Sequence, residues 1–280
     1  MSSRQRLKWV ALIVVTAGLV GAIWAFVFEP ASLVLREYEL LLPAWPKESC
    51  GLRIAVLADL HVGSPFNGME KIERIVKETN VAQPDAVLLA GDYVIQGVRG
   101  GSFVAPKDFA PVLAKLRGRL GVWAVLGNHD WWLDGPAVRA ALEQNGIRVL
   151  DNQAAELDAE TGLWLAGVGD YWEGKPDVSL ALVGVPESAT VIVFTHNPDV
   201  FPDVPDRVAL SIAGHTHGGQ VNLPLIGRPI VPSEFGERYA AGHVVEDGQH
   251  FFVSTGLGTS ILPVRFRVTP EISVLRISAE

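Results

Sequence analysis

Residues 9–28 constrain the fold of this chain more than any other segment, because they form an apolar run without a charged residue or a proline. A helix of about 20 residues is about 30 Å long, which matches the hydrocarbon core of a bilayer. A buried helix of a soluble protein rarely runs this long without a polar face. The sequence therefore predicts a transmembrane anchor over residues 9–28.

The charges around this run predict its orientation. Three of the first eight residues are basic, whereas only Arg36 and Lys47 lie in the stretch that follows the run. The positive-inside rule keeps the larger basic cluster in the cytoplasm. Residues 1–8 are thus expected to form a basic cytoplasmic tail, and the rest of the chain is expected on the extracytoplasmic side.

Two alternatives to a spanning anchor remain open. A cleaved signal peptide would end near the small residues 20–22, but residues 23–28 continue the apolar run beyond that point, which favours an uncleaved anchor. The helix could also lie on the membrane surface instead of crossing it.

The composition of the remaining chain is that of an ordinary globular domain, which we expect over residues 31–280. The chain has 23 Lys and Arg against 31 Asp and Glu, for a net charge of −8. This balance does not favour nucleic acid as a partner, and it gives no electrostatic attraction to anionic lipid, so the helix is expected to supply the membrane attachment. Cys50 is the single cysteine, which excludes an intrachain disulfide, and we interpret it as structural.

The hydrophobic pattern predicts strands that first alternate with helices and then dominate. Alternation of this kind is typical of a buried, largely parallel sheet, and the later strands suit a second sheet packed on the first. The sequence thus predicts an α/β fold of two packed sheets flanked by helices. The expected strands are 54–58, 86–90, 122–126, 163–167, 190–194, 210–213, 242–245, 249–254 and 272–277, and the expected helices are 69–80, 109–116 and 136–145.

Five polar blocks stand out, and most of them follow an expected strand, where ligands bind in open α/β sheets. They contain five of the seven histidines, and the other two, His243 and His250, are interpreted as structural or solvent-facing. Carboxylates and imidazoles together suit divalent transition metal ions, and so many of them suit two ions sharing a carboxylate. The blocks are Asp59-Leu60-His61, Gly91-Asp92, Gly127-Asn128-His129-Asp130, Thr195-His196-Asn197 and Gly214-His215-Thr216-His217.

The order of these blocks resembles the calcineurin-like metallophosphoesterase superfamily. The context Ala-Asp-Leu-His, His-Asn-Pro-Asp and Gly-His-Thr-His-Gly-Gly-Gln looks most like its bacterial membrane-anchored branch, which is similar to UDP-2,3-diacylglucosamine pyrophosphohydrolases of lipid A biosynthesis. The resemblance implies an α/β-β/α sandwich and two divalent metal ions. Mn²⁺ is the expected ion, with Zn²⁺, Fe²⁺ and Mg²⁺ as alternatives.

The resemblance also implies a role for each polar residue of the blocks. One metal ion would be held by Asp59, His61 and His217, the other by Asn128, His196 and His215, and Asp92 would bridge the two. His129 matches the family's proton donor or phosphate-binding group, and Asp130 would orient the imidazole of His129.

These expectations together predict a hydrolase in the bacterial inner membrane that cleaves a phosphodiester or pyrophosphate, in a small-molecule or lipid-linked substrate. A water shared by two ions is expected to lose its proton and attack phosphorus, while His129 protonates the leaving oxygen. The aromatic pairs Trp131-Trp132 and Tyr171-Trp172 would contact an acyl chain or a base, or else pack in the core. The alternatives are a nuclease or general phosphodiesterase on the same fold and a non-catalytic metal-binding membrane protein.

Overall fold

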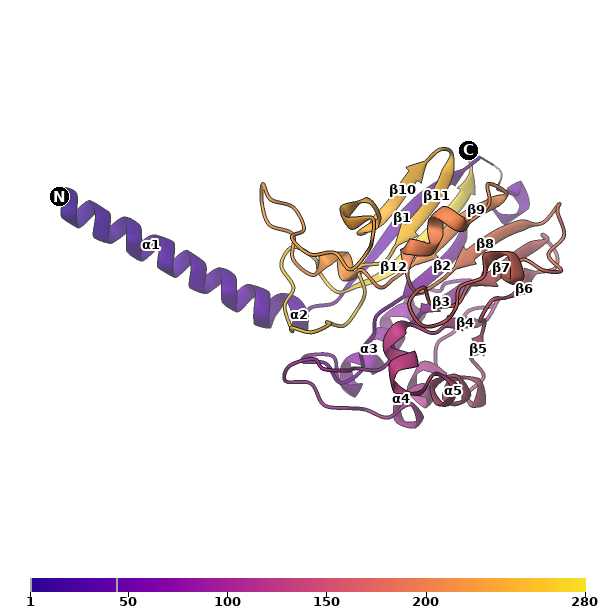
Figure 1. The fold of residues 1–280 in the computed structure, drawn as a ribbon, viewed down its shortest axis with the longest axis horizontal. Coiled ribbons are helices and arrows are strands. Elements are labelled where there is room, and N and C mark those ends of the chain that lie inside the picture. Colours follow the sequence, from indigo (N-terminus) through magenta and orange to yellow (C-terminus); the bar gives the residue numbers. More distant parts are fainter. Residues whose placement is uncertain (1, 44) are drawn as a thin grey trace.

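The computed structural model describes residues 2–43 and 45–280, and it confirms the expected two-sheet sandwich (Figure 1). One sheet has the order β1-β12-β2-β3-β4-β5, and the other has the order β10-β11-β9-β8-β7-β6. The strands of the first sheet are β1 (Val34–Leu42), β12 (Glu271–Ala279), β2 (Leu52–Leu57), β3 (Ala86–Ala90), β4 (Val122–Val125) and β5 (Arg148–Val149). Those of the second are β10 (Gly242–Glu246), β11 (Gln249–Val253), β9 (Val208–Ala213), β8 (Thr190–Phe194), β7 (Leu163–Gly167) and β6 (Gln153–Asp158).

Alternate residues of the strands build three apolar layers. Ile54 and Leu88 of the first sheet pack against Leu165 and Phe194 of the second and form the central layer. Side chains of opposite parity in the first sheet, such as Leu57, pack on the outer helices. These helices are α3 (Met69–Val81), α4 (Pro106–Leu113) and α5 (Asn128–Gln144), while α6 (Val178–Ala181) and the 3₁₀ turn η3 (Pro198–Asp203) cover the second sheet.

Helix α5 differs from the expected helix over residues 136–145 because it begins at Asn128. The chain leaves helical geometry at Asp134, where φ is −175° and ψ is 86°. Asp134 then accepts a hydrogen bond from the N–H of Ala137 at 3.0 Å, so a second helical segment starts there with Pro136 in its first turn. The expected helix is therefore the second half of α5, and its first half presents residues of the polar block.

The strand directions place the start of β1 at the edge where the polar blocks lie. Strands β2, β3 and β4 are parallel, and β7, β8 and β9 are parallel, so their carboxyl ends meet at one edge of the sandwich, which we call the site edge. Strand β12 runs antiparallel to β2, and β1 runs parallel to β12. Strand β1 therefore begins at the site edge, and the helix that precedes it ends there.

That helix projects from the sandwich as α1 (Ser3–Ile23), a π-helical turn η1 (Trp24–Phe28) and α2 (Glu29–Ala31) (Figure 1). No residue of α1 is buried, and the helix over Ser3–Ala31 is long and apolar enough to cross a membrane. It continues to Ala31, past residue 28, where the predicted anchor ends. The π turn ends two residues before Pro30, whose ring clashes with the carbonyl four residues back in a regular α-helix.

The end of the projecting helix is packed into the body through Glu29, whose side chain is only 4% exposed. Its carboxylate accepts hydrogen bonds from the backbone N–H groups of Arg267 and Val268 and from the indole N–H of Trp24, at 2.9, 2.7 and 2.8 Å. The backbone N–H of Arg265 also donates to the carbonyl of Ala25 at 2.9 Å. Residues 24–31 are thus joined to the loop that precedes β12.

Candidate metal centre

The backbone at the strand ends presents the polar side chains in a rarely used conformation. Asp59, His61, Asp92, His215 and His217 have φ values of 52°, 39°, 56°, 68° and 51°. The left-handed region is uncommon for residues other than glycine, although Asp and His tolerate it better than most. Each such residue costs about 1–3 kcal/mol, and residues of this kind cluster at functional sites.

Two glycines let the loops after β3 and β4 approach the site. A Cβ atom on Gly91 would lie 2.7 Å from Nδ1 of His196, and one on Gly127 would lie 2.6 Å from the backbone N of Asp92. Any side chain at these positions would push the loops apart. Gly91 and Gly127 are therefore required by close packing around Asp92 and His196.

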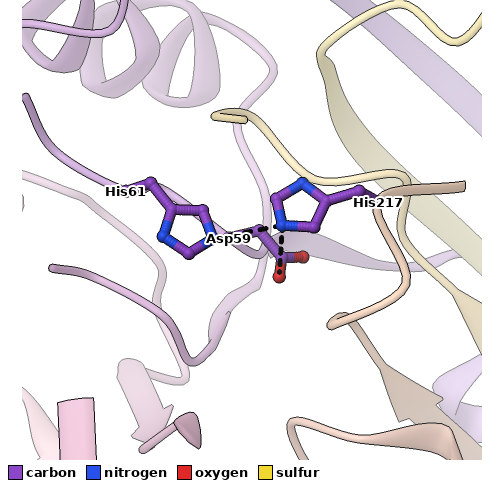
Figure 2. A group of neighbouring side chains, drawn as sticks. All are labelled: Asp59, His61 and His217. Atoms are coloured by element: carbon purple, nitrogen blue, oxygen red, sulfur yellow. Dashed lines mark hydrogen bonds and ion pairs between the residues drawn. The ribbon is translucent and has the colours of Figure 1, made fainter. Parts of the chain in front are cut away.

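The first group of candidate ligands consists of Asp59, His61 and His217, which converge in Figure 2. Nε2 of His61 lies 3.1 Å from Nε2 of His217, and Nε2 of His217 lies 3.5 Å from Oδ1 of Asp59. All three side chains are buried. Two imidazole nitrogens and a carboxylate oxygen thus face one point between strand ends β2 and β9.

The second group consists of Asp92, His196 and His215, which are also buried. Nε2 of His196 lies 3.1 Å from Nδ1 of His215 and 3.3 Å from Oδ2 of Asp92. The same Oδ2 atom lies 3.5 Å from Nε2 of His61 in the first group. Asp92 therefore stands between the two groups.

The protonation of His61, His215 and Asp92 fits a cation site. Burial lowers the pKa of His61 to about 4 and that of His215 to about 3, so both imidazoles are neutral at pH 7 and carry a free lone pair. Burial alone would raise the pKa of Asp92, but the facing His196 lowers it well below its ordinary value. Neutral imidazoles and ionised carboxylates are the forms that bind metal ions. Burial alone would lower the pKa of His196, but the facing Asp92 raises it well above its ordinary value, and burial raises the pKa of Asp59 to about 7, so these two residues would release protons when a cation binds.

Unpartnered polar atoms point to the same conclusion. Oδ1 of Asn128 and Nε2 of His215 are buried and have no hydrogen-bond partner among the described residues. Such atoms are rare in folded proteins and call for a bound ion or water. The donor set contains nitrogen and oxygen but no sulfur, which suits Mn²⁺, Fe²⁺ and Zn²⁺. The residues present therefore fit a pair of divalent cations.

His129 lies beside these groups and is 9% exposed. Its ring centroid is 4.8 Å from that of His61, and one of its nitrogens lies within 4.8 Å of the donor atoms of His61 and Asp92. The side chain is close enough to contact a phosphoryl group held between the two groups of ligands.

The structure assigns Asp130 a different contact from the expected one. Its carboxylate accepts hydrogen bonds from backbone N–H groups, and Nδ1 of His129 has no partner among the described residues. The reason is geometric, because Asp130 is the third residue of α5 and its side chain turns back over the helix N-terminus. Asp130 holds the loop that carries Asp92 and does not orient the imidazole of His129.

A buried arginine, which the sequence motifs do not reveal, lies next to the first group. The guanidinium of Arg265 lies 3.4 Å from Nδ1 of His217 and donates to the carbonyls of Thr255 and Gly256 at 2.7 and 3.1 Å. Burial lowers its pKa to about 10, so it stays charged at neutral pH. No local pattern marks this residue, because its carbonyl partners lie in an irregular loop and His217 is 48 residues away in the chain.

Two tryptophans line the open side of the candidate centre. The rings of Trp132 and Trp172 stack with centroids 6.2 Å apart, and each side chain is 46% exposed. The centroid of Trp132 lies 4.8 Å from His129, and that of Trp172 lies 4.5 Å from His215. We call this pair the tryptophan wall. Trp131, by contrast, packs against the helix layer of the core.

His243 and His250 lie outside the centre, as expected. They face each other across the β10–β11 hairpin with Nε2 and Nδ1 3.0 Å apart. Cys50 is a free, exposed thiol at the opposite edge of the sandwich.

A sandwich of two mixed sheets, with buried nitrogen and oxygen donors gathered at the ends of its parallel strands, defines a metal-dependent hydrolase of the phosphoesterase class. The chain belongs to the calcineurin-like phosphoesterase family, whose model matches residues 52–219. This membership confirms the resemblance found in the sequence, and the matched region includes every residue of the two groups.

Relatives cover the whole chain, including its N-terminal helix. The uncharacterized metallophosphoesterase YkuE of Bacillus subtilis is 30% identical, with 100% of this chain and 98% of the relative covered. The phosphodiesterase YaeI of Escherichia coli is 32% identical, with 99% of each chain covered. A transmembrane protein with metallophosphoesterase domain from Danio rerio is 28% identical over 94% of this chain and 61% of its own length.

Proposed function

We propose that this protein is a two-metal phosphodiesterase. The position of Asp92 carries the proposal, because its Oδ2 atom lies within 3.5 Å of both His61 and His196 and can serve both ions. Asn128 supports the second site with its unpartnered oxygen. We assign one cation to Asp59, His61 and His217, the other to Asn128, His196 and His215, and Asp92 to both.

The chemistry that two divalent cations supply at such a centre is Lewis acidity toward phosphoryl oxygens and activation of water. His129 stands at the rim of the centre with a free ring nitrogen and is placed to give a proton to the leaving oxygen. The tryptophan wall flanks the same opening and gives an apolar face to the leaving group.

A phosphodiester or pyrophosphate in a lipid-linked compound is the proposed substrate class. Its support is that the N-terminal helix joins the body at the site edge, so membrane and candidate centre lie on the same side of the sandwich. UDP-2,3-diacylglucosamine is the specific candidate on the cytoplasmic face. The basic tail favours a body on the extracytoplasmic side. On that side the candidate substrate is another lipid-linked phosphodiester.

We further propose that residues 9–28 remain attached as the membrane anchor, that residues 1–8 form a basic tail, and that residues 31–280 form the catalytic domain. The contacts of Glu29 support this division. They join residues 24–31, the C-terminal end of the projecting helix, to the loop before β12.

The test is hydrolysis by the purified full-length protein, chelated and then given Mn²⁺, Zn²⁺, Fe²⁺ or Mg²⁺. The substrates compared are bis(p-nitrophenyl) phosphate, p-nitrophenyl phosphate and UDP-2,3-diacylglucosamine. We expect metal-dependent cleavage of the diester over the monoester. Preference for the acylated UDP-sugar would assign the substrate and place the domain in the cytoplasm.

Variants separate the centre from the rest of the fold. Asp92→Asn keeps an oxygen for the N–H of His129 but removes the shared negative charge, so bound metal and turnover should both fall by at least about 100-fold. His243→Ala, an exposed histidine outside the centre, is the control and should change neither. If wild-type protein binds two ions per chain yet cleaves none of the three substrates, the proposal is wrong.

A further inference from the structure

Three loops at the site edge expose large apolar side chains at their tips. They are residues 94–105 after β3, residues 221–231 after the turn η4 (His217–Gly219), and residues 255–270 before β12. We call them the rim loops. Leu225 is fully exposed, Ile226 is 70% exposed and Ile261 is 72% exposed, and Phe103 and Ile230 are also exposed. Apolar tips gathered on one side of a protein mark a surface that is covered in use.

The rim loops support one another and contact the projecting helix. The backbone N–H of Arg99 donates to the carbonyl of Ile261 at 3.2 Å, and that of Asn222 donates to the carbonyl of Phe266 at 2.9 Å. Arg265, in the third loop, donates to Ala25 at the end of the helix. In Figure 1 the loops reach toward the side from which α1 projects. The rim loops and the helix therefore form one continuous surface.

The charge of the rim loops is opposite to that of the chain. The chain carries −8 overall, yet these loops contain no Asp or Glu, and their charged residues are all arginines. Arg99 and Arg267 are exposed, and Arg228 is partly buried. Apolar side chains beside arginines are the composition of segments that lie in the headgroup region of a bilayer with anionic lipids. The net charge of the chain hides this local asymmetry.

The length of the helix fits the same placement. The helix Ser3–Ala31 has 29 residues, which at about 1.5 Å each span about 44 Å, more than the hydrocarbon core of about 30 Å. Its last turn, with Glu29 packed into the body, then lies at the membrane surface. The rim loops beside this turn lie at the same level.

We propose that the rim loops insert into the headgroup region of the bilayer that holds the anchor, so that the catalytic body rests on the membrane with its candidate metal centre facing the lipid phosphates. The occupant of this surface is a lipid bilayer that contains anionic headgroups. This inference goes beyond the proposed hydrolysis, since it concerns how the body is seated and not which bond it cleaves.

Lipid contact is measured with fluorescent probes on the full chain in nanodiscs of phosphatidylcholine and phosphatidylglycerol, with and without nitroxide-labelled lipid. Cys50, the single cysteine, lies in the η2 turn (Lys47–Ser49) region between β1 and β2 at the opposite edge, so a probe there is the aqueous reference. Test probes are placed by Leu225→Cys and Ile261→Cys, each combined with Cys50→Ser. Nitroxide lipid should quench both test probes and leave the Cys50 probe unchanged. Equal, weak quenching at all three positions, or failure of the chain to enter the discs, would overturn the proposal.

A charge substitution tests the rim loops without a change in the anchor. Leu225→Asp with Ile226→Asp should reduce the quenching of a probe at Ile261, because carboxylates are driven out of the interface. Val245→Asp is the matched control, since Val245 is exposed near the far end of β10, and it should leave the quenching unchanged. Full quenching in the double variant would rule out insertion of this loop.

Discussion

The carboxylate of Asp130 accepts the backbone N–H of Asp92 at 2.9 Å, and Asp92 in return accepts the backbone N–H of His129 at 2.9 Å. Asp130 also accepts the N–H groups of Tyr93 and Gly127, both at 2.9 Å. The loops after β3 and β4 are therefore locked together by two buried carboxylates. This reciprocal contact fixes the side chain that stands between the two groups of candidate ligands.

Asp130→Asn should loosen the candidate centre without removing a ligand. An amide presents an N–H₂ group to backbone donors that the carboxylate satisfied, and each buried donor left unpaired costs about 1–3 kcal/mol. We expect a lower free energy of unfolding. We also expect metal affinity to fall by about 10- to 100-fold, the usual effect of losing a residue that orients metal ligands. Denaturant titration and metal titration measure the two effects. Asp134→Asn, an exposed helix-capping position, is the control and should alter neither.

His129→Ala should separate catalysis from metal binding. The side chain lies beside the centre, but the two groups of ligands are complete without it. Loss of a proton donor lowers kcat by about 10²–10⁴-fold. Metal content, measured by mass spectrometry of the purified variant, should stay at the wild-type value. If metal is lost together with activity, His129 is a ligand and not a donor.

Trp172→Ala should change substrate preference more than turnover. Aromatic contacts of this kind contribute about 0.5–1.5 kcal/mol, so KM for substrates with an aromatic or acyl leaving group should rise by about tenfold or less. Trp132→Ala should act in the same direction because the rings stack. Steady-state kinetics on diesters with small and large leaving groups measures the effect. A uniform fall in kcat would mean that Trp172 instead supports His215, which it contacts edge-on.

Lys71 should make stability depend on pH. Burial, with a further contribution from Arg265, lowers the pKa of Lys71 to about 7, and its Nζ atom donates to the carbonyl of Pro30 at 3.0 Å. Between about pH 7 and about pH 10.4 the unfolded chain holds a proton that the folded chain lacks. Stability therefore rises with pH across this window, by at most about 1.4 kcal/mol per pH unit.

Lys71→Met should remove the pH dependence that Lys71 contributes. The free energy of unfolding of wild type minus that of the variant should therefore increase as the pH rises from about 7 to about 10. Lys77→Met, an exposed lysine on the same helix, serves as the reference and should run parallel to wild type. Parallel curves for the Lys71 variant as well would mean that Lys71 keeps its proton in the folded protein.

The anchor should survive in the mature protein. Residues 24–31 are held by Glu29 and Ala25, and cleavage near residue 22 would leave this packed helix end without its preceding turns. Intact mass spectrometry of membrane-extracted protein should therefore show a chain that includes residues 9–28, resistant to extraction by alkaline carbonate. A mass beginning after residue 22 would establish a cleaved signal peptide.

The sequence predicted most of the central sheets, because strands such as β3 and β8 are buried on both faces and read as continuous apolar runs. It did not predict β1, β5 or β6. Strand β1 exposes several side chains and is completed by pairing with β12, which is more than 220 residues away in the chain. Only the tertiary fold supplies that partner.

For the site, sequence determined the chemistry and tertiary structure decided the geometry. The blocks around Asp59, Asp92 and His217 combine residue types that bind metal ions, and each lies next to a strand end, so local pattern was enough to single them out as candidate ligands. The contacts of Asp130, Arg265 and Glu29 could not be read in this way. Asp130 and Glu29 accept backbone N–H groups from loops that pairing of β3 with β4 and of β1 with β12 brings beside them. Arg265 donates to carbonyls of its own loop, and only the folding of that loop turns its guanidinium toward His217.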